Sequence, residues 1–111
     1  MSMKNIATSH NFSCVAAATA ILGDKWTPLI IQALSESPSR FCHLQDDIGG
    51  VNPRTLSARL GKLEEVGIIT KQPCPNAPAR DQYTLTDKGH DLLPIIKSMT
   101  TWGDKYAKNL V

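Results

Sequence analysis

The sequence predicts a mainly α-helical fold of the α+β class, in which a small β-hairpin follows a group of helices. Three observations support this prediction. Apolar residues recur at helical spacing over most of the chain, two short β-prone segments lie together between residues 68 and 85, and glycines and prolines separate the segments. The chain has 111 residues, of which 41% are hydrophobic. This is enough for one core, so we expect a single domain over residues 1–111.

Three helices are expected in the first part of the chain. A small, apolar segment predicts an N-terminal helix over residues 14–22. The next helix begins between Asp24 and Thr27, because apolar residues then follow the spacing of a core-facing helix: Trp26, Leu29, Ile30, Ala33 and Leu34. Phe41, Leu44 and Ile48 outline a short third helix, which ends at Gly49-Gly50.

Residues 49–67 are the most informative stretch, because they predict a turn followed by a capped, amphipathic, basic helix. Asn52 is a favourable N-cap, Pro53 suits the first helical position, and Gly67 can adopt the left-handed conformation that ends a helix. Arg54 and Lys62 face away from the leucines that share one side, Leu56, Leu60 and Leu63. Residues 24–67 therefore predict helices that include a helix-turn-helix, with this basic helix as its second member.

The net charge of +2 is unevenly distributed along the chain. Residues 50–80 carry five basic and two acidic residues, a balance of +3, whereas the rest carries seven basic and eight acidic residues, a balance of −1. A basic segment between nearly neutral ends is typical of nucleic-acid-binding proteins. The alternative is an ordinary solvated charged face.

Residues 68–85 predict two strands with a projecting loop, the arrangement called a wing when it follows a helix-turn-helix. Ile68–Gln72 is β-prone, and Asp81–Leu85 alternates polar with apolar residues. The loop Pro73–Arg80 contains three prolines, so we expect it to be rigid and longer than a two-residue turn, with Lys71 and Arg80 at its base. The predicted fold is thus a winged helix-turn-helix with a two-stranded β wing.

A final helix is expected over residues 86–110, with Thr86 as its N-cap and Pro94 bending or dividing it. Its apolar residues, together with those of the N-terminal helix, exceed what the core of so small a domain requires. We therefore expect the N- and C-terminal helices to be dimerisation helices of a homodimer, through these side chains of the final helix: Ile96, Met99, Trp102 and Tyr106. The alternative is that both helices pack only within the monomer.

Several separate motifs occur in the order in which one family of regulators has them. They are Gly23-Asp24-Lys25-Trp26-Thr27, Arg40-Phe41, Leu60 to Gly67 with Leu-Glu-Glu at its centre, Tyr83-Thr84-Leu85-Thr86, and Trp102-Gly103. From Cys14 to Gly103 the chain resembles the HxlR-type transcriptional regulators. The resemblance implies a winged helix-turn-helix related to the MarR regulators, acting as a homodimer on an inverted-repeat operator in double-stranded DNA.

Cys14 is the candidate sensor residue. Members of the HxlR-type family often carry a cysteine just before the first helix, and some use it to sense oxidants or electrophiles; here Val15 follows, where such members have proline. The N-terminal end of a helix stabilises a thiolate, which is the reactive form of cysteine. The alternative is a small, inert, partly buried residue.

The predicted DNA contacts come from the basic helix, the wing and two helix starts. The residues of the basic helix nearest to base edges in the major groove are Asn52, Arg54, Thr55, Ser57 and Ala58. Lys62 is expected at the sugar-phosphate backbone, and Arg59 either at a phosphate or in an ion pair with an acidic neighbour. Arg80 is expected in the adjacent minor groove, or else in an ion pair with Asp81. Phosphate contacts are expected from Lys25, Thr27 and Arg40, the last with an internal ion pair as its alternative.

An enzyme is not expected. The three cysteines and three histidines form no CxxC pair and no HExxH motif, and no paired-carboxylate motif appears. Cys42 and His43 would point about 100° apart on a helix, so we expect no metal site and no cofactor, and Cys42 is assigned to the core. A winged helix that contacts proteins without specific DNA binding is the second hypothesis, but it does not require the basic segment.

No membrane interaction is expected. The longest apolar run, Val15–Leu22, has eight residues, far fewer than the roughly 20 of a membrane-spanning helix. Residues 1–12 lack the apolar segment of a secretory signal. We therefore expect a cytoplasmic protein.

Overall fold

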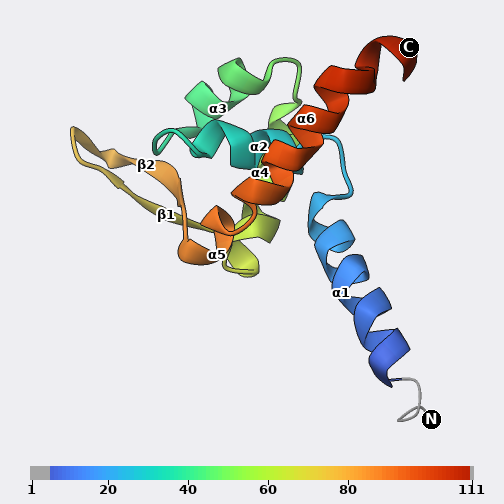
Figure 1. The fold of residues 1–111 in the computed structure, drawn as a ribbon. Helices are drawn as coiled ribbons and strands as arrows, with labels where there is room; N and C mark the ends of the chain where they lie inside the picture. The colour runs from blue at the N-terminus through green and yellow to red at the C-terminus, as the bar shows by residue number, and fades with distance from the viewer. Residues whose placement is uncertain (1–5, 111) are drawn as a thin grey trace.

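The computed structural model describes residues 6–110, with side chains over residues 13–108. In this range the elements are α1 (Ile6–Leu22), α2 (Thr27–Leu34), α3 (Phe41–Ile48), α4 (Pro53–Glu65), β1 (Ile69–Cys74), β2 (Ala77–Leu85), α5 (Asp87–His90) and α6 (Leu93–Leu110) (Figure 1). The two strands form one antiparallel sheet. The predicted fold class, mainly helical with a two-stranded wing after a helix-turn-helix, is confirmed.

The core lies between α2, α3, α4 and the base of the wing. Its fully buried side chains are Ile30, Ile31, Leu44, Leu56, Leu60, Leu63, Ile68 and Ile69. The three leucines predicted to form the apolar face of α4 are all among them. The buried leucines therefore anchor α4 along its length, and this keeps its outer face in a fixed position.

Both ends of α4 are set by the residues that the sequence indicates. The backbone N–H of Arg54 donates to Oδ1 of Asn52 at 2.8 Å, which caps the first turn. Gly67 follows the last turn with φ of +81°, a conformation that residues with a Cβ rarely adopt. These two signals fix the length of the helix and the direction in which the chain enters the wing.

The wing differs from the prediction at its tip. The strands continue to Cys74 and Ala77, so only Pro75 and Asn76 form the turn, and the predicted longer rigid loop is wrong. The register shifts between Pro73 and Cys74, which places extra residues of β2 in a bulge. Prolines are tolerated because each strand of a two-stranded sheet has an unpaired edge, where no backbone N–H is needed.

Two sets of hydrogen bonds attach the wing to the helices. Ser39 and Tyr83 exchange backbone hydrogen bonds of 3.0 and 2.7 Å, which tie β2 to the segment that leads into α3. Thr86 donates from Oγ1 to the carbonyl of Gly67 at 2.6 Å and accepts the N–H of Gly89 at 3.1 Å. Thr86 thus acts as the predicted N-cap and also closes the base of the wing.

The predicted final helix is divided into α5 and α6. The break falls at residues 91–92, and Pro94 lies in the first turn of α6, where its missing N–H costs no hydrogen bond. The first turns of α6 pack on the core, and Ile96 is only 5% exposed there. Ile96 is therefore a core residue of the monomer, and its assignment to a dimer surface is wrong.

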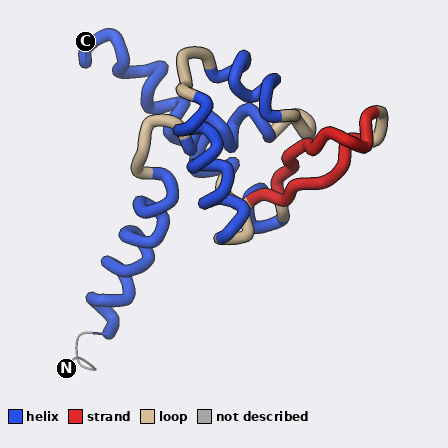
Figure 2. The backbone as a smooth tube through the Cα atoms, turned by 180° about the vertical axis from the view of Figure 1, so that it is seen from behind, coloured by secondary structure: helices blue, strands red, loops and turns tan. Residues whose placement is uncertain are grey.

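α1 is longer than predicted and projects from the rest of the molecule. It begins at Ile6 rather than at residue 14, and Figures 1 and 2 show it leading away from the other helices. Ile21 and Leu22 at its C-terminal end pack against the core, whereas residues 13–17 are exposed.

Among the described residues no single helix has the length and apolar character to cross a membrane; only the pair Ser13–Leu22 and Thr27–Leu34, bent by 77°, meets that test together.

Candidate nucleic-acid interface

The outer face of α4 is open along its length. The predicted contact residues Asn52, Arg54, Ser57, Ala58 and Lys62 are all exposed on it, and Thr55 is half-buried. Since the leucines opposite are locked in the core, these side chains are presented on a rigid support. A helix of this kind, the second of a helix-turn-helix, fits the major groove of B-DNA.

Asp24 organises the start of α2 and reaches α4. Its Oδ1 accepts the backbone N–H groups of Trp26 and Thr27 at 2.7 and 2.8 Å, and its Oδ2 accepts the hydroxyl of Thr27 at 2.6 Å. Burial acts to raise the pKa of Asp24. The hydrogen bonds from Thr27 and Trp26 and the charge of Arg59 outweigh burial, so the pKa lies below its usual 3.8. Asp24 is thus a fixed negative charge beside the basic helix.

Thr27 does not lie where a phosphate contact would require it. The side chain is 2% exposed, and both its hydroxyl and its backbone N–H are donated to Asp24. The prediction that Thr27 binds phosphate is therefore wrong, because the carboxylate of Asp24 already occupies the site that a phosphate would take.

Arg59 forms the ion pair that was one of its two expected roles. Its Nε lies 3.3 Å from Oδ1 of Asp24, with the arginine side chain 39% exposed. The contact is an ion pair without hydrogen-bond alignment, since Nε itself is buried and finds no hydrogen-bond partner among the described residues. Arg59 therefore links α4 to the start of α2 and keeps part of its guanidinium accessible.

The other basic residues of the interface are held loosely. Lys62 lies 3.9 Å from Glu65, and Lys71 lies 4.0 Å from Asp81, with all four side chains exposed. Exposed ion pairs of this kind contribute about 0–1 kcal/mol. A phosphate can displace them at little cost.

Three further predicted contacts lie on different elements. Lys25 is exposed, with Nζ 4.6 Å from the centre of the Trp26 ring. Arg40 is half-buried at the residue before α3, and Arg80 is exposed in the bulge of β2, near the tip of the wing rather than at its base. The three cations thus come from three separate elements, the α1–α2 loop, the start of α3 and the wing.

Cys14 lies in the middle of α1, not at its start. The helix begins eight residues earlier, at Ile6, so stabilisation of a thiolate by the helix N-terminus does not apply. The side chain is exposed and lines a small groove with Val15 and Ile95 of α6. Cys42 is exposed on α3, and its assignment to the core is wrong: Leu44 is the buried residue of this helix, and Cys42, two positions earlier, points to nearly the opposite face.

An exposed apolar stripe runs along α6. Met99, Trp102 and Tyr106 are 45%, 55% and 38% exposed, and Ile95 extends the stripe with 43%. The rings of Trp102 and Tyr106 lie 5.2 Å apart, centre to centre. So large a set of apolar side chains on one helix face is typical of a surface that is covered by a partner.

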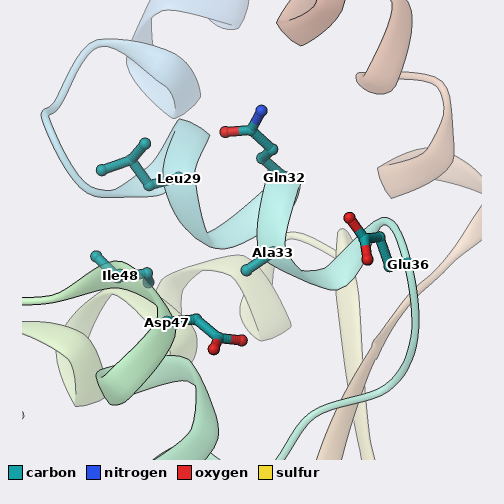
Figure 3. A pocket seen from close by; sticks show the side chains of 6 residues that line it. All are labelled: Leu29, Gln32, Ala33, Glu36, Asp47 and Ile48. Atoms are coloured by element: carbon teal, nitrogen blue, oxygen red, sulfur yellow. The ribbon is translucent and has the colours of Figure 1, made fainter.

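A pocket between α2 and α3 has the opposite charge from the α4 face. Figure 3 shows Glu36 and Asp47 on either side of Ala33, with Leu29, Gln32 and Ile48 around them. Its charged lining residues are both acidic, so this surface repels phosphate. The sign of the charge distinguishes the α4 side as the one suited to a nucleic acid.

Two residues of the site were not among the predicted ones, Asp24 and Ile95. The side chain of Asp24 accepts the N–H groups two and three residues further on, as an N-cap does, so a capping rule applied near the start of α2 points to Asp24. Ile95 could be found from spacing, because residues 95, 99, 102 and 106 follow helical steps of four, three and four. The choice between Ile95 and Ile96 depends on which face of α6 packs against the core, because adjacent residues on a helix point about 100° apart.

A capped basic α4 beside a wing defines a winged-helix DNA-binding protein. The family model of the HxlR-like helix-turn-helix matches residues 21–110, and the chain belongs to this family. It is 38% identical over 91 residues to an uncharacterized HTH-type transcriptional regulator of Halalkalibacterium halodurans, a match that covers 81% of this chain and 80% of that protein. It is 34% identical over 92 residues to the HTH-type transcriptional regulator YodB of Bacillus subtilis, covering 83% and 82%.

Solved structures agree with this assignment. The reduced form of YodB from B. subtilis superposes with a TM-score of 0.72 at 34% identity, covering 82% of this chain and 89% of that one. The reduced form of the redox regulator HypR gives a TM-score of 0.79 at 26% identity, covering 86% and 95%. YodB has also been solved in quinone-bound and diamide-treated forms, and HypR in its oxidised form. The protein is a helix-turn-helix transcriptional regulator, not an enzyme.

Proposed function

We propose that the protein binds an inverted-repeat operator as a homodimer, with α4 in the major groove of each half-site. The observation that carries this proposal is the exposed face of α4, which combines a capped N-terminus with Arg54, Ser57 and Lys62 above a fully buried leucine face. Asn52, Arg54, Thr55, Ser57 and Ala58 face base edges. Lys62, Lys25 and Arg40 contact phosphates, and Arg80 enters the minor groove from the wing. A cytoplasmic location belongs to the same proposal, because the target is DNA.

The test compares operator binding by two variants, one at a residue proposed to contact a base and one at a residue proposed to contact a phosphate. The operator is first selected from fragments of the source genome that bind the protein. Arg54→Ala should weaken operator binding by roughly 5- to 150-fold and relax the preference for one base, because a bidentate arginine–guanine pair is worth about 1–3 kcal/mol. Lys62→Ala should weaken binding to every sequence and lower the salt dependence by about one counterion.

Lys108 on the last turn of α6 provides the control. It is exposed and distant in sequence from the α4 face, so Lys108→Ala should bind as the wild type does. If Arg54→Ala bound the operator as tightly as Lys108→Ala, the proposed docking of α4 would be wrong.

The proposed dimer surface consists of the α6 stripe and the exposed part of α1. Met99, Trp102 and Tyr106 remain from the sequence prediction, and Ile95 replaces Ile96. Support comes from their exposure and from α1, which projects from the other helices and whose residues 13–17 are exposed (Figure 1). In sedimentation velocity at micromolar concentration the wild type should be a dimer, and Trp102→Glu a monomer with an unchanged circular dichroism spectrum. A monomeric wild type would exclude this surface.

Cys14 is proposed as a sensor of oxidants or electrophiles. Support comes from its exposure on α1, beside the proposed dimer surface, and from relatives solved in quinone-bound and diamide-treated forms. Diamide should lower operator affinity of the wild type and of Cys42→Ser, a control at another exposed cysteine, but not of Cys14→Ser. An effect of diamide that survives in Cys14→Ser would remove Cys14 from the response.

A further inference from the structure

A second cavity lies beside α4, on a different flank from the residues that we propose face base edges. It lies between the C-terminal end of α1, the α1–α2 loop and α4, and its volume is about 520 Å³. Its apolar wall includes Ala20, Ile21 and Leu63, and its charged residues are Asp24, Arg59 and Lys62. A volume of this size is within the range of small-molecule sites, about 300–1,000 Å³.

The charges of the cavity favour an anion. Arg59 and Lys62 are three residues apart on α4, so they project from the same flank of the helix. The carboxylate of Asp24 is already committed to three hydrogen bonds from the α1–α2 loop and the start of α2. The charged residues of the lining leave a balance of one positive charge, and the ion pair of Lys62 with Glu65 is long, at 3.9 Å.

Arg59 adds a specific requirement for an acceptor. Its buried Nε makes no hydrogen bond among the described residues, although Oδ1 of Asp24 is 3.3 Å away. A buried donor without an acceptor costs free energy, and a ligand oxygen that reorients the guanidinium removes that cost. An uncharged apolar ligand would leave this donor as it is.

The apolar wall distinguishes an organic acid from an inorganic anion. Ile21 on α1 and Leu63 on α4 both line the cavity; Leu63 belongs to the core, and Ile21 packs against it. A carboxylate that carries a hydrocarbon ring or chain would cover this wall while its oxygens meet Arg59 and Lys62. Inorganic phosphate would satisfy only the cations.

We propose that this cavity binds a small organic carboxylate, which holds Arg59 and Lys62 and so competes with the DNA backbone for Lys62. This inference rests on the proposed function, because the competition requires that Lys62 contact phosphate. Coupling between two ligands is reciprocal, so DNA must weaken carboxylate binding by the same factor by which the carboxylate weakens DNA binding. DNA binding would thereby respond to a small carboxylate through Lys62 of α4, independently of Cys14.

The test uses benzoate as the probe and the full chain as the protein. Methyl signals of Ile21 and Leu63 are followed by NMR during titration with benzoate, with benzamide as the uncharged analogue and with inorganic phosphate. Benzoate should shift both methyl signals saturably, with at least five-fold higher affinity than either benzamide or phosphate. Equal binding of benzamide would show an apolar groove without an anion site, and equal binding of phosphate would show a site for the DNA backbone; either result overturns the proposal.

Substitutions at Lys62 and Arg59 test whether these two residues bind the carboxylate group of benzoate. Lys62→Gln should weaken benzoate binding at least five-fold, whereas Lys108→Gln should not change it. Arg59→Gln should weaken benzoate binding further, provided that circular dichroism shows that the variant is folded. If Arg59→Gln is unfolded, Lys62→Gln alone decides the test. Unchanged affinity in Lys62→Gln would exclude the cavity as the site.

Failure of this inference and failure of the proposed function give different results. Operator binding that is specific but indifferent to saturating benzoate would reject the competition and leave DNA recognition intact. Benzoate binding at Ile21 and Leu63 in a protein that binds no DNA at low salt would reject the proposed function and, with it, the competition for Lys62.

Discussion

Asp24 gives the most direct test of how the helix-turn-helix is held together, through the variant Asp24→Ala. The variant leaves the N–H groups of Trp26 and Thr27 and the buried hydroxyl of Thr27 without their acceptor. Loss of a capping side chain costs about 0.5–2 kcal/mol, and an unpaired buried hydroxyl costs about 1–3 kcal/mol. The expected loss is therefore about 3 kcal/mol, or a fall in Tm of about 12 °C for a domain of this size.

The assay is thermal unfolding followed by circular dichroism at one fixed protein concentration, because dimerisation makes Tm depend on concentration. Asp46→Ala is the matched control, since Asp46 is exposed on α3 and its replacement should change stability by less than about 0.5 kcal/mol. A Tm of Asp24→Ala within about 3 °C of the control would show that Asp24 is not a structural centre of the site.

The pH dependence of the stability of Asp24→Asn separates the effect of the charge of Asp24 from the effect of its shape. The pKa of Asp24 is lower in the folded protein than its usual 3.8, so the folded state prefers the carboxylate. The stability that this preference supplies is present above about pH 4 and is lost as pH falls through the folded-state pKa. Asp24→Asn should therefore be less stable than the wild type at pH 7, and the difference should shrink in unfolding experiments toward pH 3. A difference that stayed constant would contradict the assigned pKa direction.

Three further substitutions test particular packing and backbone features by urea unfolding. Gly89→Ala should destabilise the protein by roughly 1–3 kcal/mol, because a Cβ there would collide with the carbonyl of Ile68, whereas Gly61→Ala, with open space around it on α4, should stabilise by about 0.5–1 kcal/mol. Equal effects at the two glycines would refute the close approach of α5 to Ile68. Leu56→Ala should cost about 2–5 kcal/mol, since Leu56 is 0% exposed, and a cost below about 1 kcal/mol would be inconsistent with that burial. Asn52→Ala should cost about 1 kcal/mol through loss of the cap to Arg54, and an unchanged midpoint would refute the cap.

Local signals in the sequence are sufficient for most of the fold. Asn52, Pro53 and Gly67 mark the ends of α4 through backbone preferences that act over a few residues, and the spacing of its leucines identifies the buried face. The turn at the wing tip is tighter than the prolines predict, because prolines argue against a tight hairpin only where both strand edges are paired. The sequence does not reveal that these edges are open.

The site was less predictable where it depends on contacts between distant segments. Thr27 looks like a phosphate ligand by its place at a helix start, but Asp24 uses both of its donors. Ile96 and Ile95 are adjacent and equally apolar, yet one is buried on α2 and the other is exposed. Cys14 could be placed on a helix from the sequence, although not in its middle, because residues 7–11 (Ala-Thr-Ser-His-Asn) are mostly polar and show no apolar helical spacing.

The sequence by itself determined the order of the elements, the basic second helix of the helix-turn-helix and the family, because capping, periodicity and charge are properties of neighbouring residues. Only the tertiary structure decided which groups remain available on that framework. It paired Arg59 with Asp24, buried Thr27 and Ile96, and formed the cavity between α1 and α4. The physical reason is that burial and ion pairing depend on the relative positions of helices, which short-range preferences leave open.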